Sequence, residues 1–135
     1  MKAQVAFEYM MIFGLALAFA IPVWIYVASV QQGTGEELSA SYAENAARQM
    51  TSSADLVYSQ GSPAKVRLNV YIPSGVDNAS ITGGRTIVFT VRTSAGPTDI
   101  FSSSVANMTG TIPSSEGSYL INIESRGSYV EITPE

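Results

Sequence analysis

A continuous apolar run at the start of the chain limits what it can fold into. The run extends from Val5 to Val30 and contains one charged residue, Glu8. Its 26 residues would form a helix roughly 39 Å long, whereas the hydrocarbon core of a bilayer is roughly 30 Å thick. The run therefore predicts a membrane-spanning helix. An ionised carboxylate at the centre of such a helix costs about 2.5 to 3.5 kcal/mol, so Glu8 needs either a shallow position or a partner.

The composition narrows the class of the remaining chain. Of the 135 residues, about a hundred lie beyond the apolar run, which is enough for one small domain. The sequence has no cysteine and no histidine, which excludes disulfides, thiolate nucleophiles and the usual zinc sites, and removes the commonest general base. The seven basic residues are scattered and are outnumbered by eleven acidic ones, so we expect no nucleic acid partner.

The sequence contains no recognisable catalytic constellation. Serines are abundant, but no histidine is present to activate one. The acidic residues are mostly isolated, and several lie near turns, where capping or solvation is their default role. We therefore expect a protein that is not an enzyme and that has no catalytic residue, cofactor or metal site. The serines that we expect to be solvated or in loops are Ser52, Ser53, Ser102, Ser103, Ser104, Ser114 and Ser115.

The basic residues predict the orientation of the membrane helix. Lys2 precedes the apolar run and the next basic residue is Arg48, so the positive-inside rule keeps the N-terminus in the cytoplasm and places the following domain outside. Two simpler alternatives remain open. A secretory signal cleaved after Ala20 would put Glu8 in its hydrophobic region and leave an apolar start on the mature chain. A plain membrane anchor fits the length but gives Glu8 no role.

Residues 4–10 carry a resemblance to a known processing motif. The stretch Gln4-Val5-Ala6-Phe7-Glu8-Tyr9-Met10 is similar to the start of archaeal type IV pilin-like proteins with class III signal peptides. That pattern has glutamine first, serine or alanine third, Glu-Tyr fifth and sixth, and leucine or methionine seventh. The short basic leader Met1-Lys2-Ala3 precedes it. The resemblance covers these seven residues and the placement of the helix, and the rest of the chain agrees only in architecture.

The resemblance implies a route of processing and assembly. A membrane-embedded prepilin peptidase would cut between Ala3 and Gln4 and leave the apolar helix on the mature subunit. Subunits would then pass from the bilayer into a helical filament with the help of an assembly ATPase and a membrane platform protein. The chain would be the major structural subunit of an extracellular pilus at the cell surface, used for adhesion. An archaellin-like filament subunit and a monomeric membrane-anchored binding domain are the alternatives.

Electrostatics gives Gln4 and Glu8 a shared role after such a cut. Cleavage would create an amino group on Gln4, which is four residues and about one helical turn from Glu8. In a bundle of helices, Glu8 could also reach the Gln4 amine of a neighbouring copy. Two charges that are costly to bury singly would then be buried as a pair. We therefore expect this pairing to set the axial register between subunits.

The segment 31–60 predicts a glycine break followed by an amphipathic helix. Two glycines in Gly33-Thr34-Gly35 can interrupt a helix, and Thr34 with Glu37 three positions later is typical of a capping box that starts a new one. Upstream, Pro22 should open the membrane helix locally, because it removes one backbone hydrogen bond. The apolar positions expected to face the domain are Leu38, Tyr42, Ala46, Met50, Leu56 and Val57.

From residue 61 onward, alternating apolar residues and Gly/Pro-rich turns predict strands. We expect an α+β fold in which the long hydrophobic helix continues into an amphipathic helix packed on a small antiparallel β-sheet or β-sandwich. The predicted organisation is a leader (1–3), a transmembrane or filament-core helix (4–30), the glycine break and amphipathic helix (31–60) and an extracellular β-rich domain (61–135). The predicted strands are Val66–Ile72, Asn78–Thr82, Arg85–Thr93, Thr98–Val105 and a terminal hairpin of Tyr119–Ile123 with Tyr129–Thr133.

Two asparagines lie in the triplet Asn-X-Ser/Thr that accepts N-linked glycans. Asn78 begins N-A-S and Asn107 begins N-M-T, both in polar stretches of the domain that we place outside the membrane. Proteins of the resembled family are often glycosylated. We therefore expect a glycan at each site, the alternative being that the two asparagines are ordinary turn and loop residues.

Overall fold

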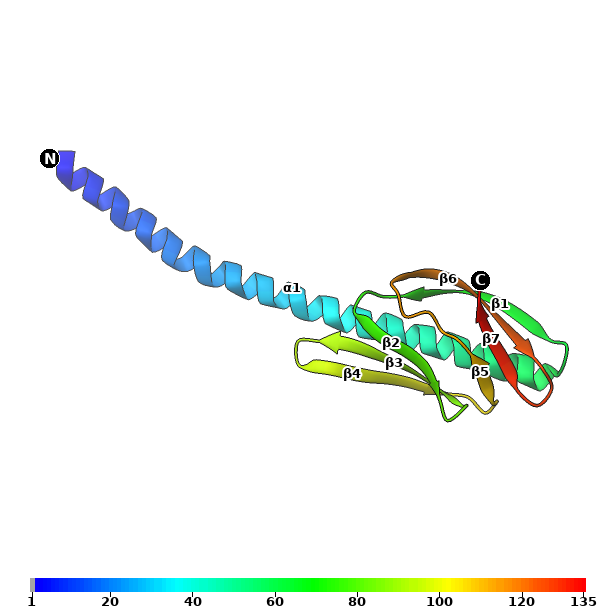
Figure 1. Cartoon of the computed structure of the whole chain (residues 1–135). Helices are drawn as coiled ribbons and strands as arrows, with labels where there is room; N and C mark the ends of the chain where they lie inside the picture. Colours follow the sequence, from blue (N-terminus) through cyan, green and yellow to red (C-terminus); the bar gives the residue numbers. More distant parts are fainter. Residues whose placement is uncertain (1) are drawn as a thin grey trace. The chain divides into compact units, whose positions relative to one another are not determined.

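The computed structural model describes residues 2–135, with side chains from Gln4 onward. By compactness the chain divides into two units, Met1–Gly35 and Glu36–Glu135. An apolar helix at the N-terminus followed by a small β-rich domain confirms the predicted α+β class. The elements are α1 (Lys2–Gln60), β1 (Lys65–Ile72), β2 (Val76–Thr82), β3 (Thr86–Thr93), β4 (Gly96–Ser103), β5 (Met108–Gly110), β6 (Gly117–Ser125) and β7 (Val130–Pro134) (Figure 1).

Helix α1 is continuous where the sequence predicts a break. Gly33 and Gly35 both lie inside it, and Thr34 donates a hydrogen bond from Oγ1 to the carbonyl of Val30 (2.9 Å) instead of capping a new helix. A glycine inside a helix costs about 1 kcal/mol relative to alanine, which is too little to interrupt one that continues on both sides. Pro22 also lies inside the helix, which continues on both sides of it.

The seven strands form two sheets. One sheet has the strand order β1-β6-β7-β5 and the other has the order β2-β3-β4. The predicted strands are all present within two residues at each end, and β6 and β7 pair as the expected terminal hairpin. Strand β5 was not predicted, and it runs parallel to β7, which corrects the expectation of a purely antiparallel sheet. Its three residues are too few to show an alternating pattern.

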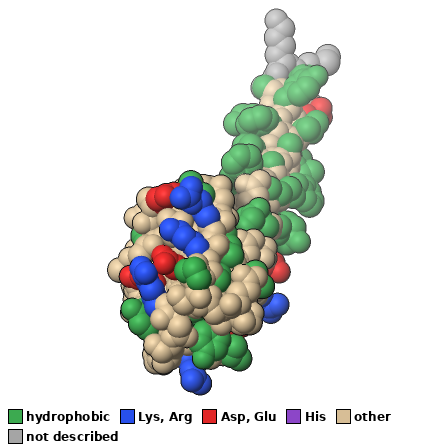
Figure 2. Space-filling view, turned by 90° about the vertical axis from the view of Figure 1, so that its right-hand side faces the viewer, with side chains coloured by type: hydrophobic (Ala, Val, Ile, Leu, Met, Phe, Trp, Pro, Cys, Tyr) green, Lys and Arg blue, Asp and Glu red, His purple; other side chains and the backbone are tan. Residues whose placement is uncertain are grey.

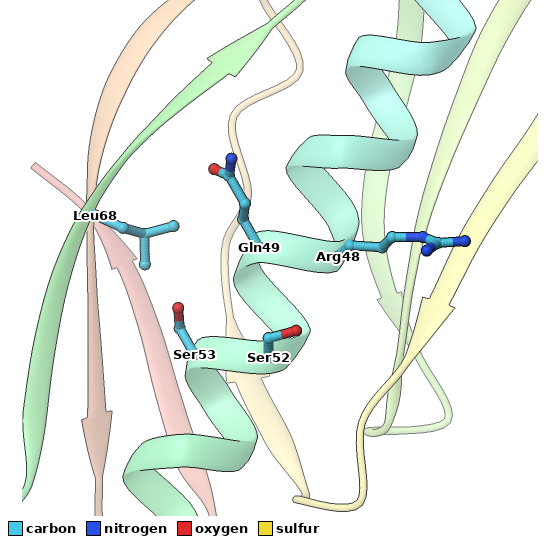
Figure 3. A pocket seen from close by; sticks show the side chains of 5 residues that line it. All are labelled: Arg48, Gln49, Ser52, Ser53 and Leu68. Atoms are coloured by element: carbon cyan, nitrogen blue, oxygen red, sulfur yellow. The ribbon is translucent and has the colours of Figure 1, made fainter.

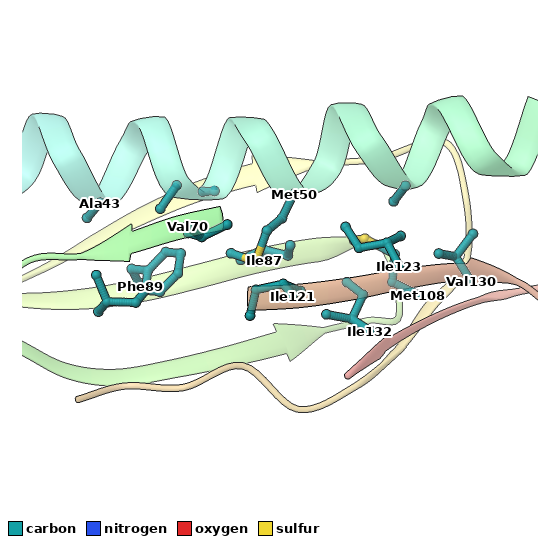
Figure 4. Packing of buried hydrophobic residues seen from close by; sticks show 14 of the residues in the cluster. Ala43, Met50, Val70, Ile87, Phe89, Met108, Ile121, Ile123, Val130 and Ile132 are labelled. Carbon is teal, nitrogen blue, oxygen red and sulfur yellow. The ribbon is translucent and has the colours of Figure 1, made fainter. Parts of the chain in front are cut away.

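One hydrophobic core joins the second part of α1 to both sheets. Ile87 and Phe89 of β3 and Ile121 of β6 are fully buried, as strand alternation predicts for residues two apart. Figure 4 shows their side chains beneath the helix, together with those of the neighbouring strands. The buried hydrophobic residues of the core are Ala43, Ala46, Ala47, Met50, Ala54, Val57, Val70, Ile72, Ile87, Phe89, Val91, Ala106, Met108, Ile121, Ile123, Val130 and Ile132.

The face of α1 that enters this core matches the predicted one only in part, because Ala46, Met50 and Val57 are buried as expected and the other predicted positions are not. Leu38, Tyr42 and Leu56, all expected to face the domain, are 52%, 50% and 48% exposed. The buried stripe consists mainly of alanines, at positions 43, 46, 47 and 54, with Met50 and Val57. Small side chains bring the helix backbone close to the strands, whereas the sequence pattern gives more weight to large apolar residues. Tyr42 instead packs edge-on against Tyr71 of β1, with ring centroids 5.6 Å apart.

Candidate functional site

The first part of α1 presents an apolar surface on all sides. Every residue from Gln4 to Gly35 is exposed within its own unit, and the large side chains include Trp24 at 77% and Met10 at 75%. One stretch among the described residues, Gln4–Gln60, contains an 18-residue window of mean hydropathy 2.2, long and apolar enough to cross a membrane. Figure 2 shows hydrophobic side chains along this helix, whereas backbone, charged side chains and side chains that are neither hydrophobic nor charged make up most of the visible face of the domain. Such a surface is compatible with a membrane anchor or a signal sequence.

Glu8 interrupts this apolar surface. It lies in α1 four residues after Gln4, so its backbone is about 6 Å further along the helix axis. Its side chain is exposed, and no ion pair involves it among the described residues. The helix therefore places Gln4 and Glu8 one turn apart, as the predicted register pair requires. Of the predicted cleavage site and leader, Met1 and the side chains of Lys2 and Ala3 lie outside the described residues.

The two predicted glycosylation sites differ in their local structure. Asn78 lies within strand β2 rather than in a loop, and it is exposed. Asn107 is also exposed and lies directly before β5, where its backbone carbonyl accepts a hydrogen bond from the amide of Val130 (2.7 Å). A Cβ atom added to Gly84 would be 3.1 Å from Asn107 Oδ1, so the side chain of Asn107 rests against the β2–β3 turn. The predicted glycosylation site Asn78 therefore lies on a strand, and the predicted site Asn107 lies beside a turn.

The depressions of the domain surface offer little chemistry. One of about 370 Å³ is lined by Arg48, Gln49, Ser52, Ser53 and Leu68, and Figure 3 shows these side chains around it. It combines hydroxyls and a guanidinium with no carboxylate or other base to activate them. Within residues 2–135, no three Asp, Glu, His or Cys side chains are grouped closely enough to hold a metal ion. The residues of this depression can therefore make polar contacts with a ligand.

The sequence analysis missed a carboxylate that organises the domain. Asp55 on α1 accepts hydrogen bonds at Oδ1 from the hydroxyl of Ser104 and from the backbone amide of Val105 (3.0 Å). Ser104 is only 7% exposed and Ser102 bonds Thr51 (2.9 Å), so neither is the solvated serine that we expected. The sequence indicates only that Asp55 lies next to the apolar positions of a helix. It does not indicate which residues donate hydrogen bonds to its carboxylate.

A second carboxylate near the start of the domain has a similar role. Glu36 accepts two hydrogen bonds from Ser94 in the β3–β4 turn, one from the backbone amide and one from the hydroxyl, each 3.0 Å long. Both carboxylates therefore have structural partners.

No protein-family model, curated protein or solved structure matches the chain, so its function is argued from the residues themselves.

Proposed function

We propose that the chain is the major structural subunit of an extracellular archaeal type IV pilus. The observation that carries this proposal is found in the first part of α1, residues 4–35, which combines an apolar surface exposed on every side with a single carboxylate, Glu8, one turn after Gln4. Before assembly the helix lies in the membrane, with the β-rich domain outside the cytoplasm. After cleavage before Gln4, the helices of many copies form the filament core and the domains form its outer layer. The most common use of such a filament is adhesion to surfaces.

The apolar surface of the helix must be covered both before assembly and in the filament. An isolated helix with hydrophobic side chains on all sides is not stable in water, because each exposed side chain costs free energy that burial would recover. A bilayer covers this surface first, and neighbouring copies cover it in the filament. Small residues such as Gly14 and Ala18 let helix backbones approach one another, while Phe13 and Phe19 fill the remaining space.

Glu8 is what favours a filament over a plain anchor. A lone membrane anchor is destabilised by a carboxylate at this position, whereas a filament subunit uses it to bind the new amine of Gln4. A pair formed between copies fixes the axial register, because slipping the helices would leave both charges unpaired in an apolar core. The prepilin peptidase, assembly ATPase and membrane platform protein are the partners that this route requires.

Substitution of Glu8 tests the proposal in the native host. E8A and E8Q should insert into the membrane as the unchanged chain does, because both remove the charge from an apolar helix. Both should reduce the number of filaments at least tenfold, since the register pair is lost. Q31A, a polar residue further along the same helix, is the matched control and should assemble normally. Normal filaments from E8A would contradict the proposed role.

Electron microscopy separates the filament from the anchored monomer. Material sheared from cells should contain thin filaments that bind antibodies against the β-rich domain. A detergent-soluble monomer that remains in the membrane, with no labelled filament, would support the alternative of a surface-anchored binding domain.

A further inference from the structure

A β-bulge decides which way the first glycosylation triplet faces. In the β2–β3 ladder Val76 pairs with Val91 and Asn78 pairs with Thr90, so two steps along β2 match one step along β3. Without this bulge, side-chain alternation would turn Asn78 to the same face as Val76, which packs against the core. The extra residue, Asp77, is exposed and forms an ion pair with Arg92 (2.9 Å). The bulge therefore turns Asn78 outward.

Beyond the bulge, side chains of β2 again alternate between the two faces of the sheet, which places the other two residues of the triplet. Ala79 packs against the core, and Ser80 is on the outer face with Asn78. The two residues that a glycosyltransferase reads, the asparagine and the hydroxyl residue two positions later, thus share one face of the sheet. This outer face is the side of the sheet β2-β3-β4 that points away from the helix.

The same outer face carries an exposed aromatic ring. Phe101 on β4 is 70% exposed, and it pairs with Val88 of β3, which in turn pairs with Ser80 of β2. In the next row Asn78, Thr90 and Asp99 lie side by side, and Thr90 donates a hydrogen bond to Asp99 (2.7 Å). Two strand spacings and two residues along β4 place the backbones of Asn78 and Phe101 about 12 Å apart.

We propose that the glycan expected on Asn78 lies with its first few sugars across this outer face and packs on Phe101. The inference rests on the proposed extracellular location of the domain. Sugar rings have apolar C–H faces and polar edges, which match Phe101 with Val88 on one side and the hydroxyl of Thr90 and the carboxylate of Asp99 on the other. Packing there removes the exposed ring from water, and the covalent link keeps the sugars near it.

The glycan would be transferred to Asn78 from a lipid-linked oligosaccharide. A membrane transferase would join Asn78 Nδ2 to the anomeric carbon of an oligosaccharide held on a lipid phosphate. The bond from that carbon to the phosphate oxygen breaks, the lipid phosphate leaves, and the amide proton passes to a base of the transferase. No oxidant or reductant is needed.

Site occupancy is the first measurement. The full-length protein is purified in detergent from its host, and the peptide that contains Asn78 is analysed by mass spectrometry. We expect a glycan on Asn78 that is lost in S80A. Protease accessibility of the domain on intact cells is measured in parallel. An accessible domain with unmodified Asn78 overturns this inference and leaves the proposed function standing, whereas an inaccessible, cytoplasmic domain contradicts both.

Contact with Phe101 is the second measurement. Calorimetry of the full-length protein gives the melting temperature with the glycan and without it, using S80A to remove it. We expect the glycan to raise the melting temperature by about 4 °C, and this gain to disappear when F101S is added. V105S is the matched control, because Val105 is equally exposed, at 71%, but follows β4 in a loop. T109A removes the other acceptor triplet and should leave the gain unchanged.

A contact between the ring and the sugars also gives a direct signal. In the full-length protein labelled for NMR, nuclear Overhauser effects should connect ring protons of Phe101 with sugar protons. An occupied Asn78 whose glycan gives no such signal, and whose stabilising effect is the same in F101S, would overturn the packing. Loss of filaments in F101S without any change in the glycan would instead identify this face as a contact between copies.

Discussion

Asp55 and Ser104 connect helix α1 to the segment that follows β4. The Ser104 hydroxyl donates a hydrogen bond to Asp55 Oδ1, and the amide of Val105 donates to the same oxygen. Ser104 Oγ also accepts a hydrogen bond from the amide of Ala106 (3.0 Å). One carboxylate thus accepts hydrogen bonds from a hydroxyl and a backbone amide of the segment between β4 and β5, and it does so beside the buried core.

The substitution D55A should therefore destabilise the domain by about 2 kcal/mol, because it leaves a buried hydroxyl and a backbone amide without their acceptor. D55N should lose less, since its amide oxygen can still accept. Denaturant unfolding of the full-length protein in detergent, followed by circular dichroism, measures the difference. E37A, which removes an exposed acid from the same helix, should stay within about 0.5 kcal/mol of the unchanged protein. Equal losses in D55A and E37A would contradict the role of Asp55.

Gly110 should be the glycine of the domain least tolerant of a side chain. Its φ of +130° disfavours other residues, and a Cβ atom there would overlap the backbone carbonyl of Ile132 in the neighbouring strand β7. G110A should cost about 3 kcal/mol or more, because the strain of φ is joined by a steric overlap with backbone. Thermal unfolding measures the loss. Gly127 also has a positive φ, +91°, but open space around it, so G127A should cost about 1 to 2 kcal/mol. Equal effects would show that β5 does not approach β7 so closely.

The alanine stripe of α1 should resist larger side chains. Ala47 is fully buried against the sheets, so A47L should destabilise the domain by about 1 to 3 kcal/mol through overpacking. S41L adds the same side chain at an exposed position of the helix and is the matched control. Chemical denaturation of both variants gives the comparison. If A47L were as stable as S41L, the helix would not pack closely on the strands.

Arg126 should contribute a small stability that does not change between about pH 6 and pH 9. Its hydrogen bond to Glu131, with the negative charges of Glu124 and Glu131, raises the pKa of Arg126 above its ordinary value. A group whose pKa is raised on folding stabilises the protein fully below its ordinary pKa and loses that effect only as the pH rises through the raised value.

The comparison of R126Q with the unchanged protein measures this contribution. The difference in unfolding midpoint should be the same across that pH range and should shrink in high salt, because the ion pairs are exposed. A difference that falls between pH 6 and pH 9 would contradict this interpretation.

The elements that follow from local patterns could be predicted from the sequence. The apolar run predicts one helix, and the alternation of Ile87, Phe89 and Val91 predicts a strand whose inner face is buried. Relations between distant segments could not be predicted. The parallel pairing of β5 with β7 leaves no periodic signal, and the packing distance that requires alanines on α1 depends on strands far along the chain.

The candidate sites likewise have features that the local sequence predicts and features that depend on distant segments. Gln4 and Glu8 are four residues apart in the sequence, and they lie one turn apart because both are in α1. The two Asn-X-Ser/Thr triplets can be read directly from the sequence. The direction in which Asn78 points depends on the bulge at Asp77, which is a property of the β2–β3 ladder. The partners of Asp55 come from a segment about fifty residues later, so neither feature is visible in the local sequence.

Mass spectrometry of the N-terminal peptide, on filaments sheared from the surface of the host cells, tests the proposed pilus subunit most directly. We predict filaments composed of this chain, with Gln4 as the first residue and a free amino group one turn from Glu8. A chain that begins at Met1, recovered as a monomer from the membrane with no filament that contains it, would contradict the proposal.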